Sequence, residues 1–267
     1  MMIMGRAEIR AARFLEKNPI EACNEVQRKF CPELFNRFGR ILDPRHQSYI
    51  IYTGKTMLGQ MYYKGIAGIT SMQDMTDRFN NPQIVENLAS YIGVALDEYL
   101  PHYVTENDYL KQLPPDELQN AIHEMVYELI RRKSFYDARF MGKWIIIVDG
   151  TQLYSGDKKI NDKCLERHYN KGTEQETVNY HIGFNRQKNW QADITHACSW
   201  NEWALKNHYL MQQISDFMKQ LYEHYVLKKL GIKKKQKNIS SELLESLARQ
   251  ITAEDIFRGD KQSLSIN

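Results

Sequence analysis

Residues 144–151 read WIIIVDGT, and this stretch is the most informative one in the sequence. Four consecutive β-branched side chains, Ile145 to Val148, predict a buried strand that ends at Asp149-Gly150. A carboxylate at the tip of a buried strand is held rigidly, which is the placement that a metal ligand in phosphoryl transfer requires. An aspartate that only caps a turn fits the same residues, so the stretch alone leaves both interpretations open.

The rest of the chain is predicted to be mostly helical. The clearest helix opens at Pro114-Pro115-Asp116, and its apolar positions share one face: Leu118, Ile122, Met125 and Leu129. Other helices are predicted over 7–40 with a break at Pro32, 46–63, 72–79 after an N-cap at Ser71, 83–96, 105–113 after an N-cap at Thr105, and 200–228. A last helix, to about residue 251, is predicted after a cap at Ser240-Ser241-Glu242. A second strand is predicted at 177–183, after a polar and basic connection over 154–176. The expected fold class is therefore α+β and mostly helical, in three regions: 1–140, 141–199 and 200–267.

Composition and charge narrow the class of protein. The 267 residues carry a formal net charge of only +3, so the chain is not a polycation. One short segment is nevertheless crowded with lysines: Lys228, Lys229, Lys233, Lys234, Lys235 and Lys237. Such a run suits a phosphate backbone, and a solvated loop is the alternative. The four cysteines form no CxxC pair, and neither a signal peptide nor a membrane-spanning run is recognisable. A soluble, reduced, cytoplasmic protein without a membrane partner is expected.

Three local patterns bear on function. Gly54-Lys55-Thr56 is not a phosphate-binding loop, because Tyr49 stands where that motif requires its first glycine and no strand precedes it. The short helices between Ser71 and Tyr109 allow a helix-turn-helix, although compact helices are common without a DNA role. Arg131, Arg132 and Lys133 follow the clearest helix, where the helix dipole favours cations; a DNA contact is the alternative. The eight histidines show no metal-ligand spacing.

Several segments, in order along nearly the whole chain, resemble the DDE transposases of bacterial insertion sequences, whose catalytic core is of the RNase H type. The matching segments are 71–76, 100–108, 142–151, 163–167, 178–181, 183–189, 204–210 and 231–234. The resemblance implies that Asp149 is the first catalytic aspartate and a ligand of Mg²⁺. It also implies that Lys188 contacts DNA at the transposon end, with Asn185 and Arg186 beside it.

The chain departs from this family where the second aspartate and the glutamate are expected. Residues 178–181 run directly into Ile182-Gly183-Phe184-Asn185, and Ile182 stands where the family has an acid. We interpret this junction as an internal deletion, so that 141–199 is a truncated remnant of the RNase H-like core with one or two strands. A single aspartate cannot hold two Mg²⁺ ions roughly 3.5–4 Å apart, so a catalytically defective transposase is expected.

Three alternatives remain open. The first is a non-catalytic DNA-binding or oligomerising remnant that modulates an active copy, with a homo-oligomer as an allowed state. The second is a decayed gene product without a selected role. The third is an unrelated helical protein. Salt-sensitive binding to transposon ends, with or without Mg²⁺-dependent cleavage, separates these alternatives.

Overall fold

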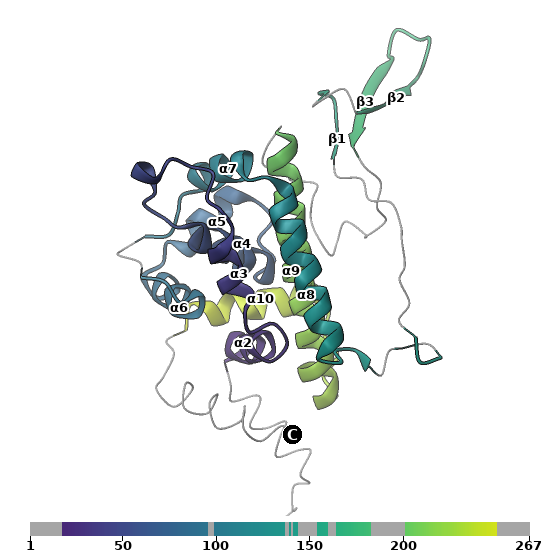
Figure 1. The fold of residues 1–267 in the computed structure, drawn as a ribbon. Coiled ribbons are helices and arrows are strands. Elements are labelled where there is room, and N and C mark those ends of the chain that lie inside the picture. Colours follow the sequence, from purple (N-terminus) through teal and green to yellow (C-terminus); the bar gives the residue numbers. More distant parts are fainter. Residues whose placement is uncertain are drawn as a thin grey trace, which may run out of the picture.

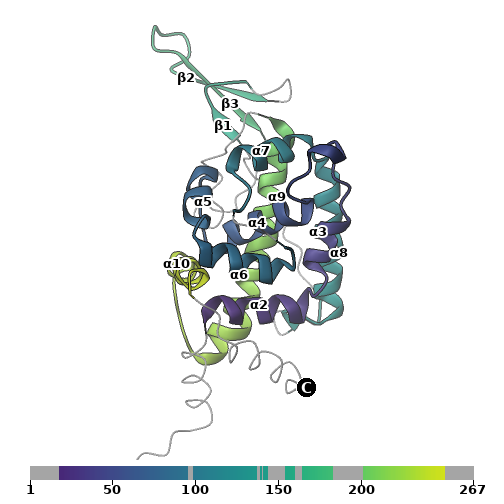
Figure 2. The same ribbon diagram turned by 90° about the vertical axis from the view of Figure 1, so that its left-hand side faces the viewer.

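The computed structural model describes residues 18–95, 99–136, 139, 141–143, 154–159, 164–182 and 201–249. Within these ranges the chain forms a body of helices and a small antiparallel sheet (Figures 1 and 2). The prediction of a mostly helical chain with a few strands is confirmed at this level. The predicted strand that ends at Asp149 lies outside the described residues.

Helices come first and last along the described chain, and the strands lie between them. The α-helices are α2 (Pro19–Phe30), α3 (Leu34–Arg40), α4 (Gly54–Ile66), α5 (Met72–Phe79), α6 (Pro82–Ile92), α7 (Tyr103–Gln112), α8 (Pro115–Arg131), α9 (Glu202–Tyr222) and α10 (Gln236–Leu247). Shorter helical turns are η1 (Gln47–Tyr49), η4 (Glu223–Leu227) and η5 (Lys228–Leu230). The strands are β1 (Tyr154–Gly156), β2 (Leu165–Tyr169) and β3 (Thr177–Ile182). No described helix combines the length and apolar character that crossing a bilayer requires.

Helices α4 and α9 pack together at the centre of the helical body (Figures 1 and 2). Their close approach depends on Gly65, because a Cβ at this position would lie 2.3 Å from Ser215 Oγ. The Ser215 hydroxyl donates to the carbonyl oxygen of Tyr62 at 2.9 Å, which satisfies a polar group in the interior. All of α4 except the half-buried Lys55 is buried, so this helix shows little amphipathic character in its sequence.

The helices at both ends of the described chain share one hydrophobic core. Its fully buried side chains include Ile20 of α2, Leu58 and Tyr62 of α4, Met211 of α9 and Leu243 of α10. The predicted regions 1–140 and 200–267 are therefore separate along the sequence but not in space. Helices α9 and α10 pack among the helices of the first region. The amide of Asn87 on α6 donates to the carbonyl oxygens of Leu247 and Arg249, which fixes the end of α10.

Local capping signals predicted several elements well. The Ser71 hydroxyl accepts from the backbone N–H of Asp74 at 2.9 Å, and α5 spans the predicted 72–79. Helix α8 starts at the predicted Pro115, and α2 and α3 are separated at Pro32 as expected. These features depend on a few adjacent residues, which explains why sequence alone located them.

The helix predicted over 46–63 was wrong in its first half. Helix α4 begins only at Gly54, after an N-cap in which the Thr53 hydroxyl accepts from the N–H of Thr56. Of the preceding residues only Gln47–Tyr49 (η1) form a helical turn, and the Arg45 guanidinium holds this stretch by donating to the carbonyl oxygen of Tyr52 at 2.6 Å and to the Asp43 carboxylate. A side chain that binds the backbone in this way competes with helix formation.

Three other helix boundaries also differ from the prediction. Helix α7 begins at Tyr103 because the His102 ring accepts from the N–H of Val104, so Thr105 is not the cap. Helix α6 ends at Ile92, before Gly93 in the left-handed conformation. Helix α10 begins at Gln236, and the Ser241 hydroxyl donates to the carbonyl oxygen of Lys237 instead of capping a helix start.

The sheet has the order β1-β3-β2, with both neighbouring pairs antiparallel. Strand β3 agrees with the strand predicted at 177–183. The polar connection predicted over 154–176 contains β1 and β2, which the sequence did not reveal. The reason is that Glu166 to Tyr169 in β2 are all exposed, so no apolar alternation marks this strand.

Candidate nucleic-acid interface

The carboxyl ends of three helices meet around the ring of Tyr225. Phe30, at the end of α2, lies 4.5 Å from Tyr225 between ring centroids. Phe135, in the turn after α8, contacts the same ring and donates its backbone N–H to the Tyr225 hydroxyl at 3.1 Å. These aromatic contacts bring together segments that are distant in the sequence, at the end of the helical body where α8 and α9 finish (Figure 1).

Cations lie on all three segments, within a few residues of these aromatic side chains. We call this surface the basic end and define it by Lys29 of α2, Arg131 at the end of α8, Arg132 and Lys133 in the following turn, and Lys228 of η5. All five residues are exposed. Basic residues are favoured at the carboxyl ends of helices, because they compensate the partial negative charge of the last carbonyl groups. Their side chains also reach water, where they can bind phosphate.

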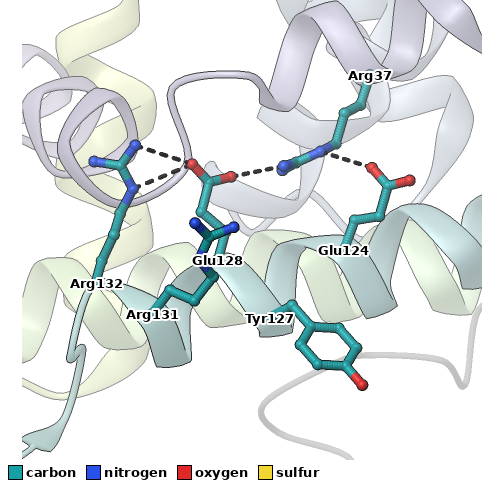
Figure 3. A pocket seen from close by; sticks show the side chains of 6 residues that line it. All are labelled: Arg37, Glu124, Tyr127, Glu128, Arg131 and Arg132. Carbon is teal, nitrogen blue, oxygen red and sulfur yellow. Dashed lines mark hydrogen bonds and ion pairs between the residues drawn. The ribbon is translucent and has the colours of Figure 1, made fainter.

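Part of the basic end is fixed by a chain of ion pairs on one side of α8 (Figure 3). Arg37 of α3 reaches Glu124 at 3.0 Å and Glu128 at 2.8 Å, and Arg132 reaches the other oxygen of Glu128 at 3.1 Å. Arg132 also donates through Nη1 to the Lys29 carbonyl oxygen at 2.9 Å, which ties the end of α8 to the end of α2.

Burial separates these pairs from ordinary surface ion pairs. The side chains of Arg37 and Glu128 are only 13% and 15% exposed, whereas freely exposed pairs contribute about 0–1 kcal/mol. Arg37 is therefore a structural residue of this surface, and Arg132, which is 43% exposed, acts structurally through its bonds to Glu128 and to the Lys29 carbonyl oxygen. Both arginines line a cavity of about 590 Å³ together with Tyr127 and Arg131.

Three cations of the basic end remain available to a ligand. Arg131 makes no ion pair with another residue in the described part of the chain, although it lies beside Glu128 (Figure 3). Lys133 lies 5.6 Å from the ring of Tyr136, and it too has no carboxylate partner among the described residues. Within the same ranges this also holds for Lys228. These three carry positive charge into solvent.

The lysine-rich segment continues from the basic end toward α10. Lys233, Lys235 and Lys237 are exposed, whereas Lys234 pairs with Glu242 at 2.6 Å. The sequence alone left open whether this run binds phosphate or is a solvated loop. The run includes Lys228, so it continues the positive charge of the basic end along the sequence.

Sequence reasoning found only part of this surface. It identified the lysine run and the cations of residues 131–133, but as separate features of the chain. Lys29, Arg37 and Glu128 were missed. The basic residues in the last turn of α2 were the only local signal for Lys29, and its proximity to α8 depends on contacts that are distant in sequence.

The structure does not describe the residues that the resemblance implied. Asp149, Asn185, Arg186 and Lys188 fall outside the described residues, so the structure neither brings them together nor separates them. The segments 163–167 and 178–181, which also carried the resemblance, contribute to the antiparallel strands β2 and β3. Across the described ranges, no three histidine, cysteine or acidic side chains converge as metal ligands.

The region between Ser71 and Tyr109, for which the sequence allowed a helix-turn-helix, is helical in most of its described residues. It folds into α5, α6 and α7, and α6 is packed against α4 and α10. Ile84, Val85 and Leu88 of α6 are buried in the common core. The polar side of this helix is engaged as well, since Asn87 binds the end of α10.

One buried cluster of charged groups was not predicted at all. Glu106 of α7 is completely buried, and neither of its carboxylate oxygens has a hydrogen-bond partner among the residues that the structure describes. Burial raises the pKa of Glu106 well above its usual range, although the nearby charge of Arg45 opposes this shift. The Arg45 guanidinium is itself paired with Asp43 at 2.6 Å and lies 4.9 Å from the Tyr109 ring. This cluster lies inside the helical body and offers no surface to a large ligand.

Comparisons of this chain with models of protein families, with curated proteins and with solved structures found no match.

Proposed function

We propose that this chain is a DNA-binding protein derived from a DDE transposase, with 141–199 as the remnant of an RNase H-like core. The observation that carries DNA binding is the basic end, where exposed cations from three distant segments form one surface that the lysine run extends. DNA carries one negative charge per about 1.7 Å of its axis, so such a surface gains affinity by displacing counterions. The family assignment is supported by the sequence segments that match in order along the chain.

The residues present do not fit a two-metal cleavage centre. Asp149 is the single family acid that carries over, and Mg²⁺ needs oxygen ligands placed by the protein at fixed positions. Of the described acids that follow it, Glu176 is engaged in the turn of the hairpin. Its carboxylate accepts from the Gly172 N–H at 3.0 Å and pairs with His168 at 2.7 Å. We therefore propose binding to transposon ends without DNA cleavage or strand transfer, and derive no metal-dependent step.

Binding and cleavage can be tested with one labelled duplex of about 30 base pairs that carries the end of a related insertion sequence. Fluorescence anisotropy between 50 and 200 mM KCl is expected to show binding that weakens with salt, with a slope of about −0.9 for each phosphate contacted. Denaturing gels of the same samples with Mg²⁺ are expected to show an intact strand. Absence of binding at 50 mM KCl would refute the proposal. Nicking that disappears in Asp149→Ala would refute the loss of cleavage.

A further inference from the structure

The cations of the basic end differ in how much freedom their donors have. The Arg132 guanidinium binds Glu128 through Nε and Nη2 and the Lys29 carbonyl oxygen through Nη1. Arg37 is similarly engaged by Glu124 and Glu128. A guanidinium that reads guanine must direct two free donors at O6 and N7. These two arginines therefore cannot read bases without breaking the ion pairs that join α2, α3 and α8.

The remaining charge is supplied by Arg131, which lies in the cavity beside Glu128, and by lysines, at Lys133, Lys228 and along the lysine-rich segment. A lysine ammonium is a compact point charge on a flexible stem, which suits any phosphate oxygen that comes within reach. Neutralising phosphates in this way contributes affinity and positions the protein, but it carries no information on sequence.

The shape of the basic end also opposes base contacts. The major groove is about 12 Å wide and admits one α-helix, which itself measures about 10–12 Å across with its side chains. Here α2 and α8 both end beside the end of α9, joined by the contacts of Tyr225 and by Arg132. Three helix ends side by side are too wide to enter the groove together, which favours contacts with the DNA backbone.

We infer that the basic end is a sequence-independent phosphate-binding surface, which strengthens binding to every duplex by the same factor. This inference rests on the proposed DNA binding, and it assigns the sequence-independent part of the affinity to the basic end. Any preference for transposon ends then belongs to other residues of the chain. The partner of the basic end is double-stranded DNA as a polyanion, recognised by charge and not by base sequence.

The test uses the full chain and two labelled duplexes of equal length and composition, one with the transposon-end sequence and one with that sequence shuffled. The double variant Lys133→Gln/Lys228→Gln removes two exposed cations of the basic end. The matched control is Arg78→Gln/Lys111→Gln, which removes the same charge from α5 and α7, where both residues are paired with aspartates. Circular dichroism melting confirms that each variant is folded.

The basic-end variant is expected to weaken binding to both duplexes by the same factor, so that the ratio of the two Kd values does not change. Its salt slope is expected to fall by about 2, one for each cation removed. The control is expected to retain the wild-type slope. A changed Kd ratio would overturn the inference, and so would unchanged affinity for both duplexes. If the wild-type chain binds neither duplex, the proposed DNA binding itself fails, which is a distinguishable outcome.

Discussion

The helical body and the small sheet are stabilised in different ways. The body buries large side chains completely, including Tyr62, Tyr63 and Phe38, in a core that draws on helices from both ends of the described chain. In the sheet, Glu166 to Tyr169 are exposed, and the turn between β2 and β3 is held by hydrogen bonds of Glu176. Because burial of apolar surface dominates folding free energy, changes in the body should affect the whole molecule and changes in the turn should remain local.

The largest effect is expected where α4 and α9 touch. Gly65→Ala places a methyl group 2.3 Å from Ser215 Oγ and 2.5 Å from Ser215 Cβ, which forces two packed helices apart. Overpacking of this kind costs about 1–3 kcal/mol, more than alanine gains in helix propensity. We expect the free energy of unfolding, measured by urea denaturation with circular dichroism, to fall by about 2 kcal/mol.

Gly39→Ala is the matched control for this substitution. Gly39 also occupies the last turn of a helix, but an added Cβ would meet only the flexible side chain of Lys55 at 3.5 Å, an ordinary contact distance. The variant should be as stable as the wild type or more stable by about 0.5 kcal/mol. Equal destabilisation by the two substitutions would show that the α4 and α9 packing is not the limiting contact of the body.

The second effect concerns Glu106 and its dependence on pH. Because burial raises the pKa of Glu106 well above 4.5, the folded protein keeps a proton that the unfolded chain releases. From about pH 4.5 upward, until the folded pKa is reached, this group makes the protein less stable as pH rises, by up to about 1.4 kcal/mol per pH unit. Glu106→Gln removes this contribution.

The measurement is the free energy of unfolding of the wild type and of Glu106→Gln at pH 5, 6, 7 and 8. The free energy of unfolding of the variant should rise relative to that of the wild type as pH rises. Glu86→Gln, on the exposed side of α6, is the matched surface control. A difference between Glu106→Gln and the wild type that stays constant over this range would contradict the assignment of a buried, protonated carboxyl group to position 106.

The same contrast explains how much of the molecule could be predicted from its sequence. Elements with local signals were predicted correctly. Ser71 caps α5, Pro115 opens α8, and the β-branched and aromatic residues of β3 predicted a strand. The start of α4 was missed because it depends on Arg45, which binds the carbonyl oxygen of Tyr52. Strand β2 was missed because its charged residues have no buried face to produce a pattern.

The candidate interface was predictable only in pieces. The lysine run and the cations at the end of α8 are visible in the sequence. Their proximity to Lys29 depends on the contact of Phe30 with Tyr225, which the sequence does not reveal. Glu106 had no sequence signal, because an acid in a short amphipathic helix is usually expected to face water. The residues implied by the family resemblance, Asp149 and Lys188 among them, remain predictions.

The smallest effect is expected in the turn between β2 and β3, and it tests whether the sheet is energetically separate from the body. The Glu176 carboxylate accepts from the Gly172 N–H and pairs with His168, and these contacts lower the pKa of Glu176 below 4.5. Their contribution to stability is therefore present above about pH 4.5 and is lost as pH falls through the lowered pKa.

Glu176→Gln should accelerate hydrogen exchange at the Gly172 amide at pH 7, as observed by NMR, and leave the melting temperature of the helical body unchanged. Glu174→Gln, two residues away in the same exposed turn, should change neither quantity. A lower melting temperature in Glu176→Gln would show that the body depends on the turn, because exposed hydrogen bonds alone open locally without unfolding a core that they do not touch.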